Sequence, residues 1–265
     1  MVTLFAIFAI IFYIVSCTRQ FLNIGKKSFD RTKTLAIGGA AVSCHAISWF
    51  SGIAGASYVD LGFFNVGSLI SLVISCLILI SAIKKPVENL LLGIFPMSAV
   101  ILACATFIPA DGRFMILADG GLLTHVILSI VAYSVLTIAA FQAILLMLQN
   151  RQLKHKHMGG IISILPPLQT MDRLLFELLG IGTLLLTLAI GSGFIFLNDL
   201  FAQHLAHKTA FTLMAWATFS FLLFAHWRFG WRGNVAGKWT LLGTGFLVIA
   251  YFGSKLVLEL ILNKV

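Results

Sequence analysis

The stretch LLTHVILSIVAYSVLTIAAFQAILLML, residues 122–148, decides the fold class, because it holds no charged side chain over twenty-seven consecutive residues. A helix crosses a bilayer with about 20 mainly apolar residues, whereas membrane strands are shorter and alternate apolar with polar residues. The rest of the chain has the same character, with 60% hydrophobic and 10% charged residues and a mean hydropathy of +1.03. A soluble chain of 265 residues could not bury this much apolar surface. We therefore predict an all-α, polytopic transmembrane helix bundle.

Eight apolar runs divide the chain, and each is expected to form one membrane-spanning helix. The predicted spans are about 2–17, 35–53, 63–83, 88–109, 121–149, 174–198, 209–228 and 240–262. The segments between them are too short to fold alone. We therefore expect residues 1–265 to form a single membrane domain.

The placement of the 18 Lys and Arg residues predicts how the helices cross the membrane. The connections after the first, third, fifth and seventh spans hold fourteen of them, and the opposite connections and C-terminal tail hold the other four. Connections rich in Lys and Arg stay in the cytoplasm, so both termini are expected outside it. No basic residue precedes the first span, which indicates a membrane helix and not a cleaved signal peptide. Since the net charge of +9 serves this orientation, no nucleic-acid partner is expected.

The sequence has none of the common hydrolase and transferase motifs, since GxSxG, HExxH and the P-loop are all absent. Glu177 and Glu259 lie near the ends of their spans, whereas a cation pump needs a carboxylate near the membrane midplane. The four cysteines include no CxxC motif, so no disulfide framework is predicted. These features favour a non-enzymatic protein whose partners are the lipid bilayer and other membrane proteins.

Three histidines within the predicted spans are the candidates for chemistry: His45, His125 and His226. A neutral imidazole tolerates burial and offers a nitrogen lone pair to a metal, and haem iron is commonly bound in this way. The alternative for each is a hydrogen bond to a neighbouring helix. His204 and His207 lie in an outer connection with no acid or thiol beside them, and an exposed pair explains them better than a metal site.

Several stretches together resemble one known family of membrane proteins. They are SCHAISWF…FFNVGSLISL (43–72), LLTHVILSIVAYS (122–134), LPPLQTMDRLLFELLGIGTLLLTLAIGSG (165–193), FAHWRFGWRG (224–233) and AYFGSK (250–255). In order and spacing they are similar to the CcsA/HemX type of cytochrome c assembly proteins. The resemblance is strongest to the small YpjD-type inner-membrane branch, and it covers nearly the whole chain.

The resemblance implies a haem-binding, multi-pass protein of the bacterial inner membrane, a carrier or accessory rather than a catalyst, with haem b as its cofactor. His125 matches an outer haem ligand of the family, His226 matches an inner membrane-embedded one, and His45 matches a histidine on the second span. The chain departs from the larger members at 198–211, which reads NDLFAQHLAHKTAF and lacks their tryptophan-rich, haem-presenting segment. This departure keeps a second hypothesis open: a haem-free scaffold or regulatory subunit for a partner membrane protein. A small-solute transporter is a third.

The predicted topology also suggests which histidines share an iron. His45 and His125 are expected at similar depth on separate helices, where two imidazoles could hold one haem between them. Arg113 or Lys208 on the outer side would then be available to the propionates. His226 is expected some 20 Å deeper, at a rise of about 1.5 Å per residue, and would have to serve a second site.

Overall fold

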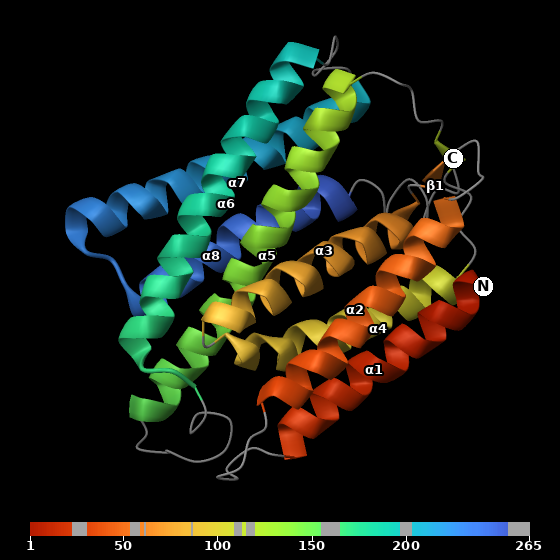
Figure 1. Ribbon diagram of the computed structural model, residues 1–265. Coiled ribbons are helices and arrows are strands. Elements are labelled where there is room, and N and C mark those ends of the chain that lie inside the picture. The colour runs from red at the N-terminus through yellow and green to blue at the C-terminus, as the bar shows by residue number, and fades with distance from the viewer. Residues whose placement is uncertain are drawn as a thin grey trace. The chain divides into compact units, whose positions relative to one another are not determined.

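A computed structural model describes residues 1–22, 31–53, 59–60, 62–85, 87–108, 113–114, 120–154, 165–196 and 203–253 (Figure 1). Within these residues, eight helices are long and apolar enough to cross a membrane. The predicted all-α bundle of about eight spans is therefore confirmed. The direction in which the helices cross stays a prediction.

The spanning helices are α1 (Val2–Leu22), α2 (Arg31–Ile53), α3 (Phe63–Lys84), α4 (Leu91–Phe107), α5 (Gly120–Lys154), α6 (Leu168–Phe196), α7 (Gln203–Phe229) and α8 (Gly233–Val248). A 3₁₀ turn, η1 (Glu88–Leu90), leads into α4, and a π-helical segment, η3 (Ile249–Gly253), continues α8. Two short strands, β1 (Val59–Asp60) and β2 (Arg113–Phe114), pair antiparallel, with Val59 opposite Phe114. No alternating pattern in the sequence indicated this pairing of two connections.

Several helices extend past the predicted spans, because hydropathy marks only the part of a helix that lies in hydrocarbon. α6 begins at Leu168, directly after two prolines, where proline's missing N–H and fixed φ suit a helix start. α7 ends where Gly230 takes a φ of 67°, a left-handed conformation that glycine adopts without strain. α8 then begins at Gly233 instead of 240.

The described helices group into two compact units of four spanning helices each. The first unit consists of residues 1–117 and 158–165, and the second consists of residues 118–157 and 166–265. That all 265 residues act as one membrane domain stays a prediction.

In the first unit, α1 packs against α2 and α4, and α3 packs against α4. Tyr13 and Phe95 are buried at the centre with their rings 5.0 Å apart. Gly38 of α2 lies so close to the Phe95 ring that a Cβ there would come within 2.9 Å of it. Ser75 and Ser98 join α3 to α4 through a 2.9 Å hydrogen bond between their hydroxyl groups. Small and polar residues thus bring these helices together, as is usual in membranes.

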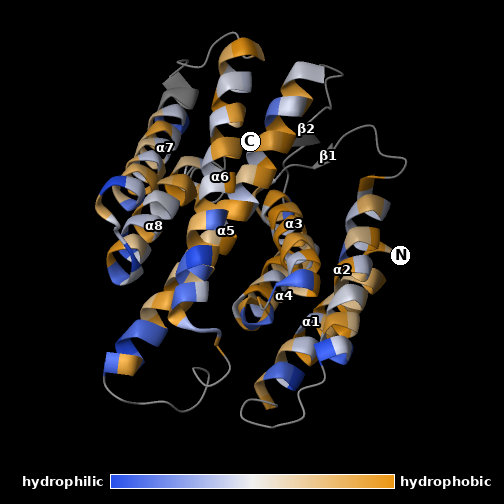
Figure 2. Cartoon of the chain, turned by 60° about the vertical axis from the view of Figure 1, so that its left-hand side comes forward, coloured by the Kyte–Doolittle hydropathy of each residue, from blue (hydrophilic) through white to orange (hydrophobic). Residues whose placement is uncertain are grey.

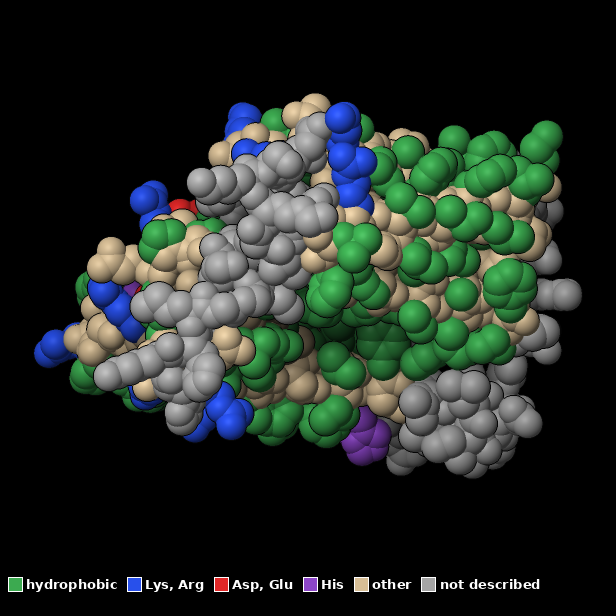
Figure 3. Space-filling view, turned by 90° about the horizontal axis from the view of Figure 1, so that it is seen from below, with side chains coloured by type: hydrophobic (Ala, Val, Ile, Leu, Met, Phe, Trp, Pro, Cys, Tyr) green, Lys and Arg blue, Asp and Glu red, His purple; other side chains and the backbone are tan. Residues whose placement is uncertain are grey.

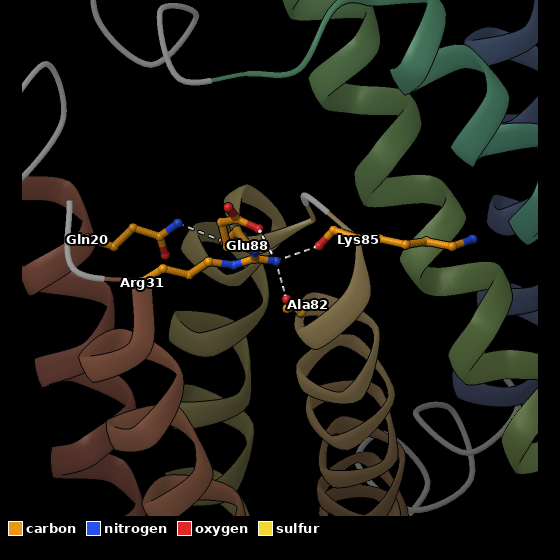
Figure 4. A network of polar contacts seen from close by, with 5 residues as sticks. All are labelled: Gln20, Arg31, Ala82, Lys85 and Glu88. Atoms are coloured by element: carbon orange, nitrogen blue, oxygen red, sulfur yellow. Dashed lines mark hydrogen bonds and ion pairs between the residues drawn. The ribbon is translucent and has the colours of Figure 1, made fainter. Parts of the chain in front are cut away.

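A polar network closes one end of the first unit, which Figure 4 shows. Arg31, the first residue of α2, donates from Nη2 to the carbonyl oxygens of Ala82 and, at 3.0 Å, of Lys85. These carbonyls lie at the C-terminus of α3, where the helix leaves its last acceptors unpaired. Glu88 lies 3.5 Å from the same guanidinium, and Gln20 of α1 donates to the Glu88 carbonyl at 2.7 Å. We call these five residues the Arg31 network.

In the second unit, α5 packs along α6 and against α8, and α7 packs against α8. Two glycines mark close approaches of these helices, because a Cβ on Gly182 would come within 2.6 Å of Leu136, and one on Gly237 within 2.6 Å of Met147. Trp216 of α7 donates from its indole to Thr187 of α6 at 2.9 Å.

The helices carry hydrophobic residues on the outer faces of each unit as well as in its core. Figure 2 shows hydrophobic residues along most of each helix and hydrophilic ones mainly toward the helix ends. On the face drawn in Figure 3, hydrophobic side chains cover a wide area that holds no charged residue. Large side chains such as Ile195 and Trp227 are 74% and 81% exposed. In water such a surface would drive aggregation, so these faces are suited to lipid.

Candidate functional site

His45 lies at the buried centre of the first unit. Its side chain is fully buried on α2, and both ring nitrogens have hydrogen-bond partners. Nδ1 lies 3.2 Å from the Tyr13 hydroxyl of α1, and Nε2 lies 2.9 Å from the Ser68 hydroxyl of α3. The Tyr13 ring also meets the imidazole edge-on, with centroids 5.9 Å apart. His45 therefore joins three helices, and a metal could bind it only after one of these hydrogen bonds breaks.

His125 has a different environment, on the second turn of α5. Its side chain is half-buried, and Nδ1 lies 2.9 Å from the carbonyl oxygen of Ala189 on α6. The Ser192 hydroxyl lies 3.2 Å from the same nitrogen and itself donates to the Ala189 carbonyl at 2.8 Å. A carbonyl oxygen can only accept, so Nδ1 of His125 must carry the proton. In the neutral ring the lone pair is then on Nε2, which has no hydrogen-bond partner among the described residues.

His226 repeats this arrangement near the C-terminus of α7. Its Nδ1 lies 2.8 Å from the carbonyl oxygen of Trp231, so here too Nδ1 is the donor and the lone pair of the neutral ring is on Nε2. The Phe176 ring of α6 stacks on the imidazole, with centroids 3.5 Å apart and planes 16° apart. A metal binds in the plane of the imidazole, so stacking of Phe176 on its face does not occupy the position beside Nε2.

The turn between α7 and α8 positions the Trp231 carbonyl for His226. The Gly230 N–H donates to the His226 carbonyl at 3.0 Å and closes α7. Gly233 also has a positive φ, 59°, and its N–H donates to Asp172 of α6 at 3.0 Å. Two glycines and one carboxylate thus hold the chain reversal that brings Trp231 back to the histidine.

His125 and His226 lie toward opposite ends of α6. His125 contacts Ala189, and His226 stacks on Phe176, thirteen residues earlier on the same helix. At about 1.5 Å per residue, these contacts are roughly 20 Å apart along the axis. The two histidines therefore cannot bind the same iron.

The other predicted residues are placed as follows. His45 belongs to the first unit and His125 to the second, and their pairing on one iron stays a prediction. His207 is exposed on the second turn of α7, and Lys208 beside it is half-buried. The side chains of His204 and Arg113 lie outside the described residues.

Comparison with known proteins adds to this geometry. Residues 37–262 match the family described as cytochrome C assembly protein. The chain is 33% identical over 260 residues to the inner membrane protein YpjD of Escherichia coli K12, which covers 97% of this chain and 98% of the relative. It is 28% identical over 176 residues to the cytochrome c biogenesis protein CcsA of Chlamydomonas reinhardtii, with 63% of this chain and 48% of that relative covered. No solved structure gives a significant match.

The chain belongs to the cytochrome c assembly protein family. It is a multi-pass inner-membrane protein, as the eight apolar helices and the relative in Escherichia coli together show. The resemblance on which the sequence analysis relied is therefore confirmed.

The cytochrome c assembly family implies haem, and the histidines of the second unit have the chemistry to bind its iron. Within the described parts of the chain, no three His, Cys, Asp or Glu side chains group as a metal site. Haem does not require such a group, because its porphyrin supplies four nitrogens and the protein adds only axial ligands. A metal-binding histidine usually donates its other ring N–H to a carbonyl or carboxylate, and His125 and His226 both do so.

Most partners of these histidines could not be found from the sequence. Tyr13 and Ser68 reach His45 from other helices, as Ala189 and Ser192 reach His125, and nothing in a single sequence states which helices are neighbours. The exception is Trp231, which follows His226 by five residues. The glycine between them was a signal that the chain reverses there.

Proposed function

We propose that this member of the cytochrome c assembly family binds haem, with Nε2 of His125 as an axial ligand near one membrane surface. The single observation that supports this proposal most strongly is the 2.9 Å contact between His125 Nδ1 and the Ala189 carbonyl. It fixes the tautomer and orients the ring, so the lone pair of Nε2 is available before any metal arrives. Haem b, which needs no covalent attachment to the chain, is the form expected.

His226 would serve a second haem site toward the other end of α6. Its Nδ1 is bound to the Trp231 carbonyl in the same manner, and Phe176 restrains rotation of the ring. The separation along α6 keeps this site apart from that of His125. In the orientation predicted from the basic connections, His125 lies near the outer surface and His226 near the cytoplasmic one.

His45 is expected to contribute less to haem binding than the other two histidines. Iron at either ring nitrogen would first have to displace Tyr13 or Ser68. A buried hydroxyl that loses its partner costs about 1–3 kcal/mol. Because the family resemblance matches His45 to a histidine of the second span, His45→Ala is still expected to change the haem spectrum. Because both ring nitrogens are already hydrogen-bonded, the change should be smaller than that caused by His125→Ala.

Binding and holding haem, without changing it chemically, is the role that these residues support. The sequence holds none of the common hydrolase and transferase motifs, and Nδ1 of each half-buried histidine donates to a carbonyl, which leaves Nε2 for a ligand. We therefore propose a carrier or an accessory protein that acts with other membrane proteins of cytochrome c assembly.

The test is the absorption spectrum of the detergent-purified protein, titrated with hemin. The wild type is expected to develop a Soret band, and His125→Ala is expected to remove or shift it. His204 and His207 were expected in a connection, but both lie in the first two turns of α7. His204→Ala and His207→Ala serve as histidine controls, and they should leave the band unchanged. If only His226→Ala alters the band, haem binding stands and the outer site is wrong.

A haem-free scaffold or regulatory subunit is the second candidate function, and two observations favour it. Segment 198–211 contains no tryptophan, and both nitrogens of His45 are already used to join helices. If the purified protein shows no Soret absorption under any reconstitution, the scaffold function replaces the haem function.

A further inference from the structure

A groove of about 300 Å³ lies between α5 and α8 within the second unit. Its α5 side is formed by one stripe of that helix, and its α8 side by two residues that lie seven positions apart. The lining residues are Ile144, Met147, Leu148, Arg151, Lys154, Asn234 and Leu241. Most of this lining is apolar, and the polar groups gather at one end.

The polar end of the groove carries positive charge that no acidic residue of the lining balances. Arg151 and Lys154 are both exposed, and neither forms an ion pair with any residue that the structure describes. Asn150 donates to the Asn234 side-chain oxygen at 3.0 Å, which fixes this amide and leaves its NH₂ group as a further donor. Three side chains that can donate hydrogen bonds, Arg151, Lys154 and Asn234, therefore line the same groove, and donors of this kind suit an anion.

The groove lies where the apolar run of α5 gives way to polar residues. α5 has 35 residues and is about 52 Å long, whereas the hydrocarbon core of a bilayer is about 30 Å thick. The apolar run of α5 ends at Gln149. From this we expect Ile144, Met147 and Leu148 at the depth of acyl chains, and Arg151 and Lys154 at the depth of phosphate groups.

The apolar part of the groove depends on Gly237. A Cβ on this residue would come within 2.6 Å of Met147, so glycine allows α8 to approach α5 closely there. Asn234 lies three residues before Gly237, and Leu241 lies four residues after it. They are therefore on the same face of α8, on either side of the contact. A chain-like apolar ligand could lie along this seam.

We propose that this groove binds one anionic phospholipid, with its phosphate held by Arg151, Lys154 and the Asn234 amide and an acyl chain along Ile144, Leu148 and Leu241. Basic pockets between membrane helices recognise anionic headgroups in this way. The two exposed cations at the polar end complement the lipid's phosphate, and the apolar stripe complements its chain. This site is separate from the histidines and does not depend on haem binding.

Native mass spectrometry of the full-length detergent-purified chain tests the proposal. The protein is titrated with phosphatidylglycerol and, in parallel, with phosphatidylcholine of the same acyl chains. We expect one phosphatidylglycerol to bind about 30-fold more tightly than phosphatidylcholine, as two basic residues at about 1 kcal/mol each would give. Equal affinity for the two lipids would overturn the proposal. So would displacement of bound phosphatidylglycerol by inorganic phosphate at the same concentration as a competing lipid.

Two pairs of substitutions separate the groove from general positive charge. Arg151→Gln with Lys154→Gln should abolish the preference, and Arg151→Lys with Lys154→Arg should keep it. Arg228→Gln with Lys238→Gln removes the same charge from exposed positions outside the groove and should also keep it. If this control variant also loses the preference for phosphatidylglycerol, the preference comes from the overall positive charge, and the groove is not a specific site.

A third variant tests the apolar part of the proposed site. Leu148→Trp adds bulk to the groove at a position that is 47% exposed, without changing any charge. It should weaken phosphatidylglycerol binding about tenfold. Unchanged binding would mean that the lipid does not lie in the groove, and the proposal would be wrong.

Discussion

The first unit uses its buried histidine to join helices, whereas the second unit leaves one nitrogen of each of its span histidines available. His45 has both ring nitrogens bonded to hydroxyl groups from two other helices. His125 and His226 each use only Nδ1, and each uses it to donate to a backbone carbonyl. The same residue type in the same kind of apolar helix can therefore be structural or ready to bind a ligand. Whether the second ring nitrogen has a hydrogen-bond partner distinguishes the two cases.

The basic residues of the two units differ in the same manner. Arg31 is held by two helix-terminal carbonyls and Glu88, so its charge completes the end of α3. Arg151 and Lys154 face a groove without an acidic residue in its lining. The comparison suggests that the first unit is mainly a scaffold and that the second carries the ligand-binding chemistry.

The largest expected effect concerns orientation, which decides the compartment each histidine faces. Since basic connections stay in the cytoplasm, alkaline phosphatase fused to the C-terminus should be active, and a fluorescent protein fused there should be dark. Activity of the two fusions is measured in whole cells. The reverse result would place His125 on the cytoplasmic side and His226 outside, and would exchange the roles proposed for them.

Removing the His45 side chain should destabilise the protein more than removing either other span histidine. His45→Ala leaves the Tyr13 and Ser68 hydroxyls buried without this partner and opens a cavity among three helices. Interhelical hydrogen bonds in membranes contribute about 1 kcal/mol each, and with the cavity we expect a loss of about 3 kcal/mol. Equilibrium unfolding in mixed micelles of mild detergent and dodecyl sulfate measures it.

His125→Ala is the matched control for this measurement, since it removes the same atoms from a half-buried site. It should lower the free energy of unfolding by about 1 kcal/mol, the loss of one hydrogen bond to a carbonyl. Comparable losses from the two substitutions would contradict the distinction between a structural and a ligand-ready histidine.

The helices could be predicted from the sequence, because a run of about 20 apolar residues suffices to cross a bilayer whatever its neighbours are. Where the helices end could not be predicted in the same way. α6 begins at Leu168 and α8 at Gly233, both before their predicted spans, and proline and glycine geometry sets these starts. The pairing of β1 with β2 involves only two residues on each strand, too few to show a pattern.

The candidate histidines were also found from the sequence, since a polar side chain is conspicuous in an apolar helix. Their roles could not be separated, because His45 and His125 look alike until their neighbours are known. The groove between α5 and α8 was not predicted at all. It depends on a close approach at Gly237 that a single sequence does not reveal.

Arg31→Ala should have a smaller effect than His45→Ala. The Arg31 side chain is 40% exposed, so solvent screens its pairing with Glu88, and most of the loss should come from the uncapped carbonyls of Ala82 and Lys85. We expect a loss of about 1 kcal/mol, measured by the same unfolding assay. Arg31→Lys should recover part of it, because an ammonium group can still donate to these carbonyls. No loss from Arg31→Ala would mean that the Arg31 network does not stabilise the first unit.

The smallest effect is expected from Arg173→Ala, which provides the exposed counterpart to Arg31. Arg173 pairs with Glu177 one turn later on α6, at 3.0 Å, but its side chain is 81% exposed. Pairs of this spacing contribute about 0.3–0.5 kcal/mol, and less when the basic residue precedes the acidic one. Removal of the Arg173 side chain should therefore be nearly neutral. Any residual loss should vanish at about 1 M salt, where charges are screened within roughly 3 Å. If Arg173→Ala instead costs as much as Arg31→Ala, capping carbonyls adds nothing beyond an ordinary surface ion pair, and the contrast between the two arginines fails.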